Sequence, residues 1–435
     1  MSEIARLYRR YRSGEISPLE VIERHLERAS TRGAELNAFT QILEFDARWA
    51  AGESVRRYRD GRPLSPLDGV PVTLKDLIQM RGAATTASSQ AAPARAAAAD
   101  AEIVARLRAA GAVLLGKTNL LEYAAGLVHP SFGPARNPWD PERTIGGSSS
   151  GSAAAVAIGA GLASIGTDTA GSVRNPASLA GIVGFKPSFG ALPTDGTIPL
   201  APSLDHLGVL ARSVADAQLV YEVLAGTRLR CPRGKLAVGI ARFQAVHPDV
   251  EEQFEALVAR LSQAGLQPVE ILGFPFSAAN AAALAILYAE AAEVHLEGIG
   301  KRSSGYAPAT LARILAGFSV DGQDYARALA VRESVEAAFC ALASACDAIV
   351  LPTLPGPATR EDGGGGDRHL AAAPLHTSVF NLLGVPAITL PMGRTREGGM
   401  PLGVQVAGLR GAEAIVLEVA RRIERLRGRW RSPTT

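Results

Sequence analysis

The chain has 435 residues, of which 45 are basic and 42 acidic, giving a formal net charge of +3, and 47% of the residues are hydrophobic. This composition can bury a large core and excludes an intrinsically disordered protein. The charge is too small and too dispersed to indicate a nucleic-acid partner, and the one basic cluster, at 421–431, is expected to be a solvated helix end.

The predicted elements alternate between helices and strands. A capping box at Ser17 to Glu20 predicts the start of a helix, and a turn at 67–70 leads into a short strand that ends at Lys75. Further strands are expected at 112–115, 236–240, 268–272, 348–351, 387–390 and 403–406, and further helices at 101–110, 248–264, 325–342 and 413–427. The glycine run at 363–366 predicts a loop. This alternation indicates an α/β layer fold with a largely internal sheet.

The number of cysteines and the length of the apolar stretches exclude several classes of protein. Three cysteines without CxxC spacing are too few for a disulfide scaffold or a four-cysteine zinc site. The N-terminus lacks the apolar core of a signal peptide, and the longest apolar stretch, at 153–165, is too short to cross a bilayer. We therefore expect a cytoplasmic protein with no membrane segment, no metal and no organic cofactor.

Two runs of small residues between 144 and 177 carry the candidate chemistry. The first contains Gly146-Gly-Ser148-Ser-Ser-Gly-Ser152, and the second contains Gly166-Thr-Asp-Thr-Ala-Gly-Ser172. Glycines let backbone N–H groups turn toward a bound group, and small neighbours leave room for it. A single serine preceded by small residues is what a nucleophile beside a backbone oxyanion hole requires.

Two commoner motifs also match this region. The stretch 147–151 fits the G-x-S-x-G nucleophile elbow, but this pattern arises easily in a Gly/Ser-rich run, and no downstream histidine stands in a triad context. The stretch that begins at 159 resembles the start of a dinucleotide fingerprint, but it has Ser164 at the last glycine position and no strand entering it. Both alternatives are weaker than a serine site of another kind.

Together the two runs resemble the signature of the amidase signature family, roughly GGSSxGS followed by GxDTxGSxRxPA. The segment 66–76 resembles the lysine block of this family, and 184–190 and 203–208 resemble its later blocks. Similarity is dense over about 65–215. The resemblance implies one amidase domain over 1–435, built on a mixed central β-sheet with helices on both sides.

The resemblance also assigns roles by position. It places the nucleophile on Ser172, the bridging serine, usually on a cis peptide, on Ser148, and the base on Lys75. The implied oxyanion hole consists of the backbone N–H groups of Thr169, Ala170, Gly171 and Ser172. A lysine can act as a base only if it is neutral, which requires burial without a carboxylate partner. In an extended segment the neighbouring Asp76 points to the opposite face.

Other residues are expected to support the site. Asp168 and Arg174 are expected to hold the loop rather than to take part in chemistry. Ser149 is a candidate for lining the site, and Arg332 falls where relatives place a substrate-binding arginine. Ala170 stands where glycine is common in the family.

The leading hypothesis is an amidohydrolase that cleaves a small linear carboxamide or a urea-like amide with release of ammonia, most similar to the carboxybiuret amidohydrolase-like bacterial amidases. The alternative is the A subunit of a glutamyl-tRNA amidotransferase complex. A non-catalytic binding protein on the same scaffold is the third hypothesis. The family resemblance also implies a homodimer with no direct nucleic-acid contact.

Overall fold

The computed structural model describes residues 2–93, 95–244, 246–342, 344–360, 376–428, 430 and 433. These residues form one eleven-stranded sheet in the order β1-β3-β2-β4-β6-β5-β10-β11-β9-β7-β8. The strands span Phe39–Ile42 (β1), Pro71–Lys75 (β2), Val113–Thr118 (β3), Ala163–Asp168 (β4), Val183–Lys186 (β5), His206–Ala211 (β6), Leu236–Ile240 (β7), Leu266–Glu270 (β8), Ala348–Pro352 (β9), Ala387–Arg394 (β10) and Pro401–Ala407 (β11).

The sheet contains both parallel and antiparallel pairs. Strand β2 runs parallel to β3 and β4, and β7 runs parallel to β8 and β9. The central pairs from β4 through β6, β5, β10 and β11 to β9 are antiparallel. The expected mixed sheet is therefore confirmed.

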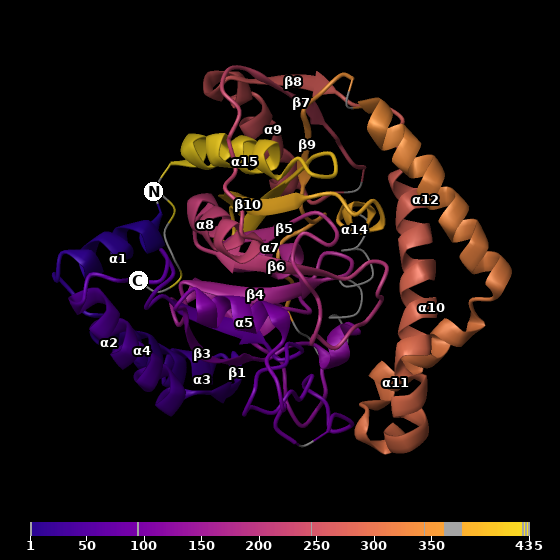
Figure 1. Cartoon of the computed structure of the whole chain (residues 1–435). Helices are drawn as coiled ribbons and strands as arrows, with labels where there is room; N and C mark the ends of the chain where they lie inside the picture. The colour runs from indigo at the N-terminus through magenta and orange to yellow at the C-terminus, as the bar shows by residue number, and fades with distance from the viewer. Residues whose placement is uncertain are drawn as a thin grey trace.

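Helices pack on both faces of this sheet. The α-helices span Glu3–Arg12 (α1), Pro18–Ser30 (α2), Arg32–Glu35 (α3), Glu44–Arg59 (α4), Glu102–Ala109 (α5), Ser150–Ala157 (α6), Arg174–Ala180 (α7), Val214–Ala225 (α8), Pro248–Val258 (α9), Phe276–Arg302 (α10), Pro308–Leu315 (α11), Gly322–Leu342 (α12), Val379–Leu382 (α14) and Glu413–Arg427 (α15). Apolar residues of α5, α8, α9 and α15 share one core with the strands, whereas α6 and α7 build a separate core with Leu210 of β6. Figure 1 shows α10 and α12 as long helices along one side of the molecule, away from the N-terminal helices α1, α2 and α4.

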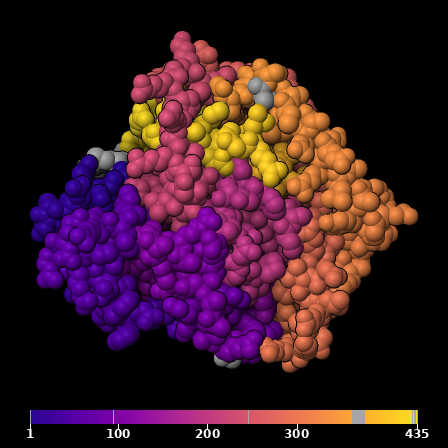
Figure 2. All heavy atoms as spheres, in the orientation of Figure 1, coloured from indigo at the N-terminus to yellow at the C-terminus, as the bar shows by residue number. Residues whose placement is uncertain are grey.

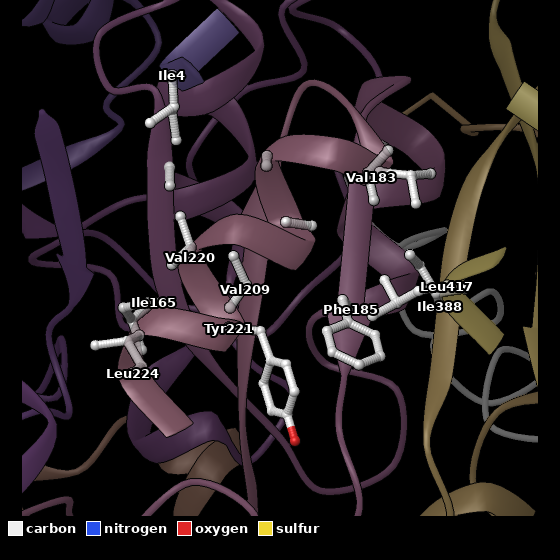
Figure 3. Packing of buried hydrophobic residues seen from close by; sticks show 14 of the residues in the cluster. Ile4, Ile165, Val183, Phe185, Val209, Val220, Tyr221, Leu224, Ile388 and Leu417 are labelled. Carbon is white, nitrogen blue, oxygen red and sulfur yellow. The ribbon is translucent and has the colours of Figure 1, made fainter. Parts of the chain in front are cut away.

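The larger core lies between the sheet and helices α8 and α15 (Figure 3). The Phe185 and Tyr221 rings meet edge to face with centroids 5.3 Å apart, and Val209, Ile388 and Leu417 are fully buried in the same cluster. Burying one such side chain contributes about 1.5–3 kcal/mol. Every residue of strands β2 to β6 is buried. These strands are therefore rigid and fix the directions of the side chains that they carry.

Most of the predicted helices and strands are confirmed, with small differences at the ends of these elements. The capping box of α2 is formed, with the Ser17 side chain accepting from the Glu20 N–H and the Glu20 carboxylate accepting from the Ser17 N–H. The helix expected to end at 264 ends instead at Val258 and is followed by a separate 3₁₀ turn, Leu261–Ala264.

The basic cluster at 421–431 is only partly solvated, because Arg422 is buried and its Nε lies 2.9 Å from the Glu418 carboxylate. The loop expected at 363–366 lies outside the described residues. In the part of the chain that the structure describes, no helix is both long and apolar enough to cross a membrane.

Candidate active site

The end of β2 carries a lysine into the protein interior. The Lys75 side chain is fully buried, and its Nζ lies 2.6 Å from Ser148 Oγ and 2.7 Å from Thr167 Oγ1. Since successive side chains of a strand alternate, Asp76 points elsewhere: its Oδ1 lies 2.7 Å from Lys117 Nζ and its Oδ2 accepts from the Thr40 hydroxyl. Lys75 therefore has two hydroxyl partners, and the adjacent acid is occupied by another lysine.

Burial changes the acid–base character of Lys75. It lowers the pKa of Lys75 from the ordinary 10.5 to about 7, although the carboxylates of Asp168 and Asp205 act in the opposite direction. At neutral pH, a large share of the amine is consequently unprotonated. An amine in this state can accept a proton from the hydroxyl that touches it.

The first small-residue run places Ser148 beside this amine. The Gly147–Ser148 peptide bond is cis, and a Cβ on Gly147 would stand 2.5 Å from Leu121 Cδ1, so a larger residue there would displace the Leu121 side chain. The following residue, Ser149, donates its N–H to the Ser172 carbonyl at 3.1 Å. This backbone contact joins the two small-residue runs.

The structure does not place Ser149 where substrate could touch it. Its side chain is fully buried, and its hydroxyl donates to the Thr167 carbonyl at 3.1 Å. The residue supports the loop, and it is not among the residues that line the cavity shared by Ser148 and Ser172.

Ser172 lies at the turn between β4 and α7 and is half-buried. Gly171, directly before it, has φ +121°, and a Cβ there would stand 2.3 Å from Thr377 Oγ1. The Ser148 and Ser172 hydroxyls line the same pocket, but no hydrogen bond joins them among the described residues. In the absence of substrate, the distance between catalytic hydrogen-bond partners is often greater than in the complex.

Three of the four backbone amides expected in an oxyanion hole are available. The N–H groups of Thr169, Ala170 and Ser172 have no acceptor among the described residues. The N–H of Gly171 instead donates to the Asp168 carboxylate at 2.8 Å. The amide of Gly171 thus fixes the loop and points away from any substrate.

A buried ion pair holds the loop that carries these amides. Asp168 and Arg174 are both fully buried, with Arg174 Nη2 2.8 Å from Asp168 Oδ1 and Nε 3.0 Å from Oδ2. Burial alone raises the pKa of Asp168, but the Arg174 guanidinium, the Lys186 charge and the Asn381 amide together outweigh it and hold that pKa well below the usual range. Arg174 also donates to Gln405 and Asn381. The pair has the structural role expected of it, since all of its groups are occupied.

Ser148 and Ser172 open into a cavity of about 90 Å³. The lining residues are Ala124, Ala125, Gly126, Gly147, Ser148, Thr169, Ala170, Ser172, Asn175, Leu200, Leu284, Leu287, Tyr288 and Arg313. Arg313 of α11 is the one charged side chain among them. It is half-buried, donates to the Ala125 carbonyl and to the Tyr288 hydroxyl, and has no carboxylate partner within 4 Å among the described residues.

Arg332, the arginine expected from the sequence to bind substrate, is half-buried in α12 and does not line this cavity. Sequence reasoning missed Arg313, Thr167 and Asp205. Of these, Thr167 has a sequence signal, because it lies in the same small-residue run as Ser172. In the described ranges, His, Cys, Asp and Glu side chains do not gather in a group of three or more that could hold a metal.

Known proteins resemble this chain over nearly its whole length. A family model described as Amidase matches residues 20–417. The A subunit of the glutamyl-tRNA(Gln) amidotransferase of Synechococcus sp. (strain WH7803) is 35% identical over 461 residues, which cover 95% of this chain and 94% of that protein. A crystal structure of an amidase has a TM-score of 0.90 at 34% identity and covers 98% of this chain and 100% of its own. A structure of a vestigial protein complex, said to reveal the evolutionary origins of an s-triazine catabolic enzyme, has a TM-score of 0.91 at 31% identity, with 99% and 100% covered.

Proposed function

The chain belongs to the amidase signature family, and from this premise we propose that it hydrolyses a small linear carboxamide or urea-like amide and releases ammonia. The observation that carries the proposal is the 2.6 Å contact between a buried Lys75 amine and the Ser148 hydroxyl, in a pocket that Ser172 shares.

The proposed first half-reaction forms an acyl-enzyme. Ser172 Oγ attacks the amide carbonyl carbon, and its proton passes through Ser148 to the neutral Lys75 amine. The amides of Thr169, Ala170 and Ser172 stabilise the negative oxygen that forms. The C–N bond then breaks, and Lys75 returns the proton through Ser148 to the leaving nitrogen, which departs as ammonia.

The second half-reaction uses the same relay. A water molecule attacks the Ser172 ester and gives a proton through Ser148 to Lys75. The bond to the ester oxygen of Ser172 then breaks, and this oxygen takes the proton back as the carboxylic acid leaves. The enzyme ends in its starting state, so atoms and protons balance. Proton transfer between the two serines requires a hydrogen bond that substrate binding must bring about.

Two residues of the pocket indicate what the substrate carries. The Oδ1 of Asn175 is buried without a partner among the described residues and suits the N–H₂ group of a primary amide. Arg313 has no carboxylate partner there and suits an anionic group on the acyl part of the substrate. We therefore propose a small amide that carries a carboxylate.

Ammonia release from a panel of amides tests this proposal, with Ser172→Ala as the blank. A fluorophosphonate probe should label Ser172, Ser148→Ala should slow labelling by about 10²–10⁴-fold, and Ser30→Ala, on the exposed end of α2, should leave it unchanged. Labelling that persists in Ser172→Ala would overturn the assignment. Arg313→Leu should lower kcat/KM for a carboxylate-bearing amide by about 10–100-fold while sparing its neutral analogue.

The second candidate function is that of one component of an amidotransferase. It is favoured by the curated relatives, which are described as the A subunit of glutamyl-tRNA(Gln) amidotransferase and are 33–35% identical to this chain. The purified chain should be assayed on glutamine with and without the other components of such a complex. Ammonia release confined to the complex would replace the hydrolase proposal by this one. The cytoplasmic location and the homodimer stay predictions, to be checked by fractionation and light scattering.

A further inference from the structure

We propose that Asp205 is a positioning residue for this site: its carboxylate holds the Thr169 end of the loop at 169–172, and its negative charge favours the ammonium form of Lys75. The inference rests on the proposed function, because it needs Lys75 to act as the base. It assigns a second buried acid to the site, besides Asp168.

The register of the sheet brings Asp205 to the loop. Asp168, the last residue of β4, pairs with His206, the first residue of β6, so residues 169 and 205 leave their strands side by side. The Thr169 hydroxyl donates to Asp205 Oδ1 at 2.6 Å. The other oxygen, Oδ2, accepts from the N–H groups of Leu200 and Ala201 at 2.8 and 3.1 Å. Three donors fix this carboxylate, and through it the position of the Thr169 amide.

A cavity of about 90 Å³ is lined by Asp205, Thr169 and Thr167, together with Thr197 and His206. Thr167 is the second partner of the Lys75 amine. The Nε2 of His206 and the Oγ1 of Thr197 are buried without a partner among the described residues. A cavity with such groups and this volume has room for water.

Of the two carboxylates that act on Lys75, Asp205 is the one without a cation beside it. Asp168 is paired with Arg174 through both oxygens, which offsets its charge. Asp205 has only neutral donors among the described residues, and Lys75 is the cation whose charge acts on its carboxylate. Burial raises the pKa of Asp205 to about 6, while the Thr169 hydroxyl, the two backbone donors and the Lys75 charge act against it.

The remaining titratable groups around this cluster are His206 and Lys186. Both are buried, and burial lowers the pKa of each. His206 directs its Nδ1 to the Leu204 carbonyl, and Lys186 donates to the carbonyls of Pro187 and Val385. Neither side chain is among the groups that act on Lys75, whose pKa depends on burial first and then on the charges of Asp168 and Asp205.

The two roles of Asp205 affect the rate of the reaction and its pH dependence in different ways. Removing the charge takes away an interaction that favours the ammonium form, so Lys75 should lose its proton at a pH lower by about one unit. Removing only the Thr169 hydroxyl frees the loop and leaves Asp205 ionised above pH 8, although without this donor the carboxylate takes up its proton at a higher pH than in the wild type. Above pH 8 the rate should then fall through the loss of positioning alone.

The test measures the second-order rate constant of labelling by a fluorophosphonate probe between pH 5 and 9. For Asp205→Asn, we expect the acid limb to move to lower pH by about one unit. For Thr169→Val, we expect about a tenfold slower rate at pH 8–9, where Asp205 is ionised. Asp195→Asn, which removes an exposed carboxylate from the same stretch of chain, is the matched control and should behave as the wild type. If Asp205→Asn does not fold, Asp205→Ser replaces it, because water in the adjacent cavity can fill the space.

An acid limb that stays in place in the asparagine or serine variant overturns the electrostatic role. An unchanged rate in Thr169→Val overturns the positioning role. Failure of the proposed function looks different, because labelling would then survive Ser172→Ala at every pH.

Discussion

Replacing Lys75 by methionine should remove activity and change how stability depends on pH. In the unfolded chain this lysine stays protonated up to about pH 10.5, whereas burial lowers its pKa in the folded protein to about 7. Between these two values the unfolded state binds one more proton than the folded state. The free energy of unfolding therefore rises with pH through this window, by about 1.4 kcal/mol per unit.

The size of the effect follows from the same two values. Below pH 7 the buried lysine costs the wild-type protein roughly 5 kcal/mol relative to a lysine of ordinary pKa, and between pH 7 and 9.5 about 3 kcal/mol of this cost disappears. Methionine has a similar length and no titrating group. It leaves the hydroxyls of Ser148 and Thr167 without their partner, but that loss does not depend on pH and cancels when the slopes are compared.

Urea unfolding of the wild type and of Lys75→Met at several pH values between 7 and 9.5 measures this difference. Lys235→Met, which removes an exposed lysine, is the matched control and should follow the wild-type slope. If the wild type and Lys75→Met show parallel pH dependence, the lysine titrates in the folded protein as it does in the unfolded one. The argument that it is a neutral base would then be wrong.

Three further outcomes follow from the geometry. Arg174→Leu should lower the free energy of unfolding by about 3–5 kcal/mol in urea at pH 7, because Asp168 would be left as an unpaired buried charge; a loss below about 1 kcal/mol would contradict this. Gly171→Ala should abolish fluorophosphonate labelling, since its φ is +121° and the new Cβ would stand 2.3 Å from Thr377 Oγ1, and wild-type labelling would refute the packing argument. In the wild type, the labelling rate should fall about tenfold per pH unit below pH 7 as Lys75 takes up its proton, and a rate independent of pH would exclude this lysine as the base.

The elements around the site could be predicted because local rules decide them. Strand alternation separates Lys75 from Asp76, and the structure shows the two side chains with different partners, Ser148 for the lysine and Lys117 for the acid. The Gly/Ser composition of the two runs predicts a tight backbone, and both runs meet through the Ser149 to Ser172 contact. The side-chain directions and the tight backbone depend on residues within a few positions of one another, whereas the contacts that they form are long-range.

Features that depend on the packing of distant segments could not be predicted. Arg313 and Arg332 both lie on helices of the α10–α12 layer, and only the way those helices pack decides that Arg313 lines the pocket. The contact from Thr169 to Asp205 spans 36 positions and arises only because β4 and β6 pair in one register.

The pocket is therefore built from two sources that can change independently. Its chemical wall comes from the loops before α6 and α7, which Lys75 of β2 and Asp168 of β4 hold through hydrogen bonds. Its opposite wall comes from α10 and α11, with Leu284, Leu287, Tyr288 and Arg313, in the helical layer at the right-hand edge of the molecule in Figure 2. A fluorophosphonate needs only the first wall, whereas an amide substrate needs both. Substitutions on α10 and α11 should thus change which amide is cleaved and leave labelling of Ser172 intact, while substitutions at 144–172 should affect both measurements together.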